Sequence, residues 1–294
     1  MSKFILINLF VLFFYSSTLF SQTTDEAKKS YLNAKIKYTT NSVWLGRSDS
    51  IVTPVFGLSA GYHFNFGAYL NTEMSIIPSR QIDILDLTTV QAGYGFSIIK
   101  DVFDADISYT HNFYSQYSTQ VGSEVIGTAT ADLSYDFDLV QLSVNGEFSF
   151  GSSSDIGISS SLSKSIDIEF KKGSSLNITP TATAYAGTQN LYAVYLVTRS
   201  QKAVHGKNSH TAKSSSKNPH ASVNSSATIT TTTTVTQEYA RFNMLDVDVS
   251  LPISYTYKKF TFAITPVMAI PLNVQSGEFT SKPFFVSLSV GYKI

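Results

Sequence analysis

The sequence predicts an all-β fold, a transmembrane antiparallel up-and-down β-barrel of about twelve strands. Three observations predict it: long stretches in which apolar and polar residues alternate, connections that are alternately short and long, and an N-terminal segment typical of secreted proteins. The clearest stretch is the last, where Phe284 to Ile294 alternate without a break between an apolar face and a small or polar face. A membrane-spanning barrel needs both faces, because one meets lipid and the other a polar interior.

The N-terminus has the order of a signal peptide. Lys3 precedes the apolar run Phe4 to Phe14, and small or polar residues follow as far as Ser21. An uncleaved anchor helix is the alternative, but the run is shorter than the roughly 20 residues that span a bilayer. We expect residues 1–21 to be the signal peptide, 22–30 a periplasmic stub and 31–294 the barrel, in the outer membrane of a Gram-negative bacterium.

Composition excludes several classes of function. The 294-residue chain has no cysteine, so it has neither disulfides nor a thiolate metal site. Its formal net charge is zero and only 14% of its residues are charged, whereas a nucleic-acid-binding protein would show a basic excess. No nucleic-acid partner and no cofactor are expected.

Strands follow one another along the chain with apolar faces that can be named in order. The first eight faces are Ala34 to Tyr38, Phe56 to Phe66, Ala68 to Ile76, Val90 to Ile98, Phe103 to Tyr109, Ala129 to Phe137, Leu142 to Phe150, and Ile156 to Phe170. The opposite faces contain many serines, which do not suit an apolar core on that side. A soluble barrel or sandwich, with the same apolar faces turned inward, is the alternative.

Connections alternate in length, as they do in barrels with short periplasmic turns and long outer loops. The short turns are expected near Asn65 to Gly67, Lys100 to Asp101, Asp136 to Asp138, Lys171 to Ser174, and Lys258 to Lys259. Aromatic residues flank most of these turns, which predicts an interfacial aromatic girdle at that end of the barrel.

The stretch Leu176 to Tyr257 is harder to assign. A turn at Gly187 to Asn190 would give thirteen strands, and an even number is the rule in bacterial single-chain barrels. The apolar phase continues through this point, so we expect Leu176 to Thr198 and Ile229 to Tyr257 to be two over-long strands. They would form one extended extracellular hairpin arm with a disordered basic tip at residues 200–228. The count is then twelve, with fourteen as the alternative.

The segment Asn33 to Ile77 contains KIKYTTNSVWLGR, a proline and LSAGYHFNFGAYLNTEMS, and it resembles the opening of the TorF-like outer-membrane porins. The matching positions are Trp44, Gly46, Arg47, Pro54, Tyr62 and Gly67. The order Gly46 then Arg47 departs from the family's Arg then Gly, and the match covers about one-sixth of the chain. The resemblance implies an outer-membrane, porin-like protein and supplies no catalytic residues.

The face opposite the apolar phase is acidic. The expected lumen-lining residues are Glu73, Asp104, Asp106, Asp132, Asp136, Glu147, Asp167, Glu169, Asp246 and Asp248. The bases in the same phase are Lys35, Lys37 and Lys293. Carboxylates that line a pore favour cations, so the sequence predicts a porin-like channel for small solutes or ions with a mild cation preference. The alternative is that these acids lie in water at strand ends or pair with lumenal bases.

Two other functions remain open. The basic residues Arg199, Lys202, Lys207, Lys213 and Lys217 suit a barrel that only anchors a surface interaction hairpin, although the composition equally suits a solvated loop. A lipid hydrolase needs a nucleophile beside a base, and neither His63 nor His111 has a serine two residues later. The expected partners are outer-membrane lipids and the barrel-assembly machinery, the latter through the C-terminal strand.

Overall fold

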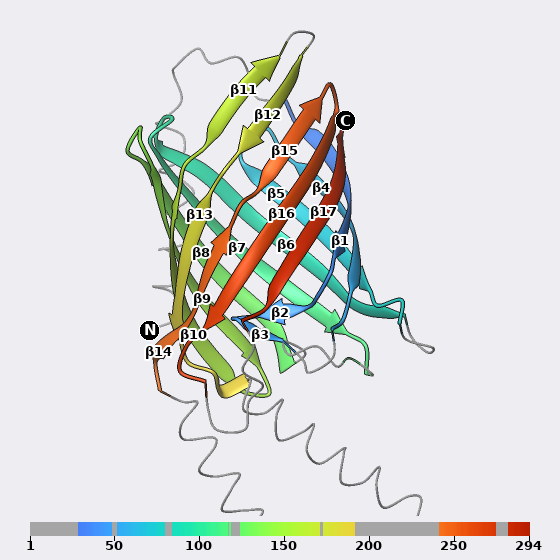
Figure 1. Cartoon of the computed structure of the whole chain (residues 1–294), viewed down its shortest axis with the longest axis vertical. Helices are drawn as coiled ribbons and strands as arrows, with labels where there is room; N and C mark the ends of the chain where they lie inside the picture. Colours follow the sequence, from blue (N-terminus) through green and yellow to red (C-terminus); the bar gives the residue numbers. More distant parts are fainter. Residues whose placement is uncertain are drawn as a thin grey trace, which may run out of the picture.

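The computed structural model describes residues 29–48, 52–79, 84–116, 118, 124–170, 173–191, 241–274 and 282–294. They form a closed barrel whose strands are tilted to its long axis (Figure 1). Its strands are β1 (Tyr31–Thr39), β4 (Val55–His63), β5 (Ala68–Ile76), β6 (Leu85–Ile99), β7 (Phe103–Tyr114), β8 (Val125–Asp136), β9 (Gln141–Gly151), β10 (Ser154–Ser163), β11 (Ile166–Phe170), β12 (Ser174–Ile178), β13 (Thr181–Gly187), β14 (Asn243–Ser250), β15 (Ile253–Tyr257), β16 (Phe260–Pro271) and β17 (Phe284–Lys293). A separate two-stranded hairpin consists of β2 (Val43–Trp44) and β3 (Arg47–Ser48).

Three strands of the ring are each divided in two. Pro180 separates β12 from β13 and Pro252 separates β14 from β15, because proline has no backbone N–H for the ladder. The register continues across the first break, from Ile178 paired with Ile253 to Thr181 paired with Ser250. Counting β10–β11, β12–β13 and β14–β15 as one strand each reduces the 15-stranded sheet to twelve, as predicted.

The C-terminal strand closes the ring. β17 pairs with β16 on one side and with β1 on the other, so Ile36 lies between Val290 and Leu58. All of these pairings are antiparallel. Closure leaves no free edge along the shared wall, which is what a sheet in hydrocarbon requires.

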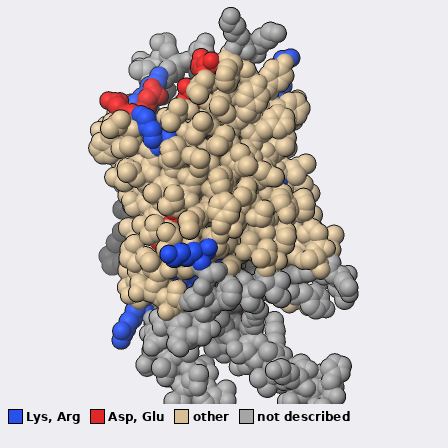
Figure 2. Space-filling model, in the orientation of Figure 1, with Lys and Arg blue, Asp and Glu red and all other residues tan. Residues whose placement is uncertain are grey.

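The apolar phase faces outward, as predicted. Ile36 is 58% exposed and Ile107 is 56% exposed, although both lie in the middle of long strands. Figure 2 shows an outer wall whose charged residues gather towards its two ends. No helix in the described residues is long and apolar enough to cross a membrane. A closed barrel with an apolar outside belongs in a bilayer, which confirms the predicted outer-membrane location.

At the end of the barrel with the long connections, which we call the loop end, the chain leaves the barrel earlier than predicted. The ninth ring strand stops at Gly187, and residues 188–191 turn away with a helical conformation at 190–191, so the predicted continuation of the strand beyond Gly187 is wrong. The cause is Asp155, which accepts hydrogen bonds from Thr188 Oγ1 (2.6 Å) and from the backbone N–H groups of Asn190 (2.6 Å) and Leu191 (2.9 Å). In the next described segment, the sheet continues with β14 from Asn243.

The predicted signal peptide, most of the stub and the basic loop lie outside the described residues. Arg199, Lys202, Lys207, Lys213 and Lys217 all belong to that loop. The structure instead extends the sheet at the opposite end, where β11 and β12 project beyond the other tight turns (Figure 1).

Candidate functional site: the lumen and its outer mouth

The lumen has two walls of opposite charge. Lys35 and Lys37 on β1 and Lys293 on β17 belong to the inward phase of adjacent strands. Asp132 on β8 and Glu147 on β9 belong to the inward phase of two other adjacent strands. The strand order places β8 and β9 halfway round the ring from β17 and β1, so the basic wall and the acidic wall face one another across the lumen.

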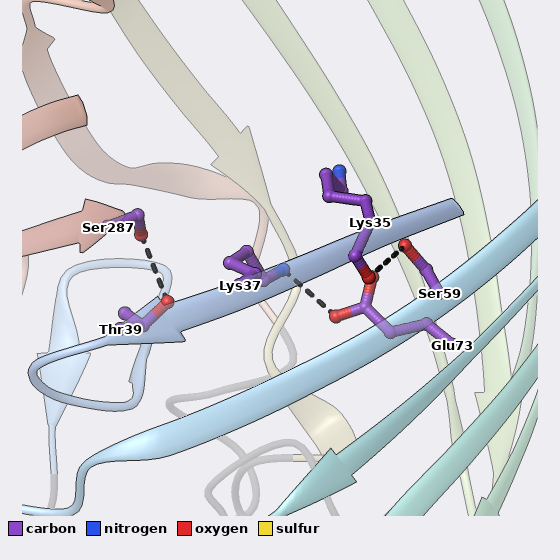
Figure 3. A network of polar contacts seen from close by, with 6 residues as sticks. All are labelled: Lys35, Lys37, Thr39, Ser59, Glu73 and Ser287. Carbon is purple, nitrogen blue, oxygen red and sulfur yellow. Dashed lines mark hydrogen bonds and ion pairs between the residues drawn. The ribbon is translucent and has the colours of Figure 1, made fainter. Parts of the chain in front are cut away.

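The basic wall is partly neutralised by Glu73 on β5. Figure 3 shows Lys37 Nζ pointing at Glu73 Oε1, 2.9 Å away, from two strands over. Gly57 lies between them on β4, where a Cβ would come within 2.9 Å of that carboxylate oxygen. A residue larger than glycine would therefore push the pair apart. Lys293 Nζ lies 3.8 Å from the centroid of the Tyr31 ring, so this ammonium is packed on an aromatic face.

The acids of β7 and β8 have neutral hydrogen-bond partners. Asp106 Oδ1 accepts from the Tyr69 hydroxyl at 2.8 Å, and Asp132 Oδ1 accepts from Asn145 Nδ2 at 2.7 Å. Asp104 accepts from Ser97 Oγ at 2.5 Å. These partners orient the carboxylates without cancelling their charge. A cavity of about 290 Å³ lies directly against all three acids.

The other predicted lumen residues occupy three different environments. Glu147 faces the lumen from β9 and is half-buried. Asp246 and Asp248 lie on β14 near the loop end, and Asp246 is only 1% exposed. Asp167 and Glu169 lie on β11, where every residue is exposed, and they belong to the extension rather than to the ring around the lumen.

The hairpin β2–β3 enters the lumen at the loop end, which we call the outer mouth. Arg47 is 3% exposed and donates to the backbone oxygens of Leu45 (2.8 Å), Leu245 (3.4 Å) and Leu272 (3.4 Å) and to Gln189 Oε1 (3.2 Å). One guanidinium thus ties the loop after β1 to three other segments of the mouth.

Gly46 sits against the wall beside this arginine. Its φ is +70°, and a Cβ there would lie 2.6 Å from Asp246 Oδ1 and 3.0 Å from Pro271 Cα. Glycine is therefore required by both the backbone conformation and the space. Asp246 Oδ1 also accepts from the backbone N–H of Ile270 at 3.1 Å, which fixes the carboxylate that the hairpin abuts.

Trp44 and Leu45 reach across towards β9, β10 and β13. With Glu147, Asp155 and Tyr185 they border a small space of about 20 Å³. That volume is about one water molecule, so the hairpin packs closely against this wall and narrows the mouth. Sequence reasoning left a plugged or very narrow lumen possible but did not predict which segment enters it. The hairpin's only signal was the sequence from Trp44 to Arg47, which we used solely for the family resemblance.

The two histidines outside the basic loop lack the partners of a hydrolase. His63 stacks on Tyr31 with ring centroids 4.7 Å apart, and its Nε2 lies 3.4 Å from Asn33 Nδ2. His111 is on the outward phase, with its Nδ1 3.0 Å from the Tyr109 hydroxyl. Neither partner is a serine that the ring could activate. The described residues contain no group of three or more potential metal ligands.

Comparison with solved structures finds similar proteins at low sequence identity. The KdgM porin superposes with a TM-score of 0.46 at 10% identity, over 88% of this chain and 98% of that one. The NanC porin gives 0.46 at 9% identity, over 90% and 100%. LpxR from Salmonella typhimurium gives 0.41 at 8%, over 88% and 99%. No family model and no curated protein matches the sequence, so the resemblance to TorF-like porins stays a prediction. The chain is a twelve-stranded outer-membrane barrel.

Proposed function

We propose that this protein is a narrow porin-like channel for small water-soluble solutes or ions, with a mild preference for cations. The observation that supports it is the row of carboxylates at Asp104, Asp106 and Asp132, which border a cavity and have neutral partners. Carboxylates along a pore lower the energy of cations in it and raise that of anions. The opposing lysines moderate this preference, and Glu73 takes up part of the charge of Lys37.

The test is single-channel recording of the purified protein in a planar bilayer under a salt gradient. The expected reversal potential has the sign of cation selectivity. The double variant Asp106→Asn with Asp132→Asn should move the reversal potential towards zero or past it, because both lumenal charges are removed while both side chains keep an acceptor oxygen. Asp101→Asn, at the β6–β7 turn, removes one charge outside the lumen and serves as the control.

Absence of conductance steps from wild type and from variants with a loosened mouth would contradict the proposal. Equal reversal potentials for wild type and the double variant would leave a channel but remove the role of the acidic wall. The anchor alternative predicts the first of these results, because it requires no conduction.

A further inference from the structure

The extension at the tight-turn end has an unpaired sheet edge. β10 pairs with β9 as far as Ser163 opposite Gln141, and Gln141 is the first residue of β9. Three residues later β11 begins, and among the described residues its only pairing is with β12 on the other side. Figure 1 shows β11 as the outer strand of the projecting hairpin. Its free edge therefore starts where the neighbouring strand stops.

The ladder shows which backbone groups are free. Lys164 N donates to Pro180 O, so even-numbered residues of this ring strand bond towards the β12–β13 side. In an antiparallel sheet, successive residues of a strand direct their backbone N–H and C=O groups to opposite sides. The groups of the odd-numbered Asp167 and Glu169 therefore point to the open edge. Within Ile166–Phe170 there is no proline, lysine or bulge, so the charges of Asp167 and Glu169 and the five-residue length are what limit pairing at that edge.

The side chains of β11 define what could pair there. Ile166, Ile168 and Phe170 form one face and are 46%, 41% and 49% exposed. Asp167 and Glu169 form the other face. Asn177 Nδ2 and Ser165 Oγ both donate to the Asp167 carboxylate, at 2.8 and 3.0 Å. These hydrogen bonds hold the pKa of Asp167 below its usual range, so this face is negative at neutral pH.

A second copy of this chain does not suit the edge. Antiparallel pairing of two β11 strands about Ile168 would place Asp167 of each copy opposite Glu169 of the other, and like charges directly opposite are destabilising. A strand with cations on one face and apolar residues on the other meets both faces of β11 favourably.

We propose that β11 is a docking edge, on the periplasmic side, for an extended segment of a partner protein in which Lys or Arg alternates with apolar residues. The main-chain ladder supplies the attachment through Asp167 and Glu169, whose carboxylates select the cations. Ile166, Ile168 and Phe170 pack on the apolar side chains between them. This interaction is independent of conduction through the lumen.

The test uses the full chain in phosphatidylcholine nanodiscs and a fluorescent nine-residue peptide of alternating Lys and Val, followed by anisotropy. The same residues in block order form the control peptide. Glu169→Pro removes a free-edge donor while leaving the β11–β12 ladder, since proline is tolerated where the N–H faces solvent. We expect binding to weaken about fivefold, the usual effect of one lost hydrogen bond. Asp167→Asn with Glu169→Gln should weaken it similarly.

Asp101→Asn with Asp136→Asn is the matched control, because it removes two charges from the same end of the barrel and leaves β11 unchanged. Hydrogen exchange gives a second measurement: the amides of Asp167 and Glu169 should exchange fast in the free chain and become protected by the alternating peptide. Binding of the block-order peptide with equal affinity would overturn the proposal. So would equal binding by the β11 variants and wild type, or protection of these two amides before any peptide is added.

Discussion

Arg47→Ala should open the outer mouth. In the structure the guanidinium joins the β2–β3 hairpin to Gln189 Oε1 at 3.2 Å and to the oxygens of Leu245 and Leu272 at 3.4 Å each. A hydrogen bond from a charged donor contributes about 1.5–3 kcal/mol, and the two long contacts count for less, so the three together hold the hairpin by about 3 kcal/mol. Losing that much raises the ratio of open to closed mouth about 100-fold.

Single-channel recording measures this ratio as the time spent in a higher-conductance state divided by the time spent in a lower-conductance state. Arg47→Lys keeps the charge, but a lysine ammonium cannot bond several separated acceptors as the planar guanidinium does. Its ratio of open to closed mouth should therefore lie between those of wild type and Arg47→Ala. Lys35→Ala removes a lumenal base away from the hairpin and should change ion preference without changing the ratio. The reasoning is refuted if Arg47→Ala, shown to be folded by its heat-dependent gel mobility, opens no more often than wild type.

The remaining predictions concern the same mouth, the lipid face and the basic wall. Gly46→Val should also favour the open mouth, because a Cβ would lie 2.6 Å from a carboxylate oxygen at a φ of +70°, and a conductance unchanged from wild type would contradict this. Leu288→Arg should destabilise the folded barrel in liposomes by about 2–4 kcal/mol in urea titration, whereas Ser289→Arg, which faces the lumen, should cost much less. Lys37→Gln should increase cation selectivity in bilayer recordings by leaving Glu73 without its ion partner, and an unchanged reversal potential would count against it.

The sequence was sufficient for the barrel because a closed sheet in lipid repeats one rule at every strand. Each outward residue must be apolar, so the phase of Phe284 to Ile294 or of Ile156 to Phe170 is visible without knowing any partner. The same rule predicts the tight turns, because a turn lies where one alternating stretch ends and the next begins. The strand count also follows, because an even number constrains the stretch that alternation alone left open.

The mouth could not be predicted, because its contacts join residues far apart in the chain. Asp155 ends the strand at Gly187 by binding backbone N–H groups 35 and 36 residues later, and nothing near Gly187 announces it, since the apolar phase continues past that point. Arg47 likewise meets Leu245 across 198 residues. The alternation of apolar and polar residues predicts which face of the sheet a residue occupies, but it does not predict which loop folds into the lumen.

The unpaired edge of β11 also bears on where the membrane can lie. Hydrocarbon tolerates no free backbone N–H or C=O group, so the apolar layer must end before Asp167, whose edge groups have no strand partner in the part of the chain that the structure describes. β9 and β10 stay paired as far as Gln141 and Ser163. On this wall the hydrocarbon layer can therefore extend towards the tight-turn end no farther than this pair. Tyr135, near the end of β8, and Phe137, just after it, have ring centroids 4.5 Å apart and lie beside that level. An aromatic pair there is where an interfacial girdle would be expected, so the sheet edge and the aromatic residues indicate the same boundary independently.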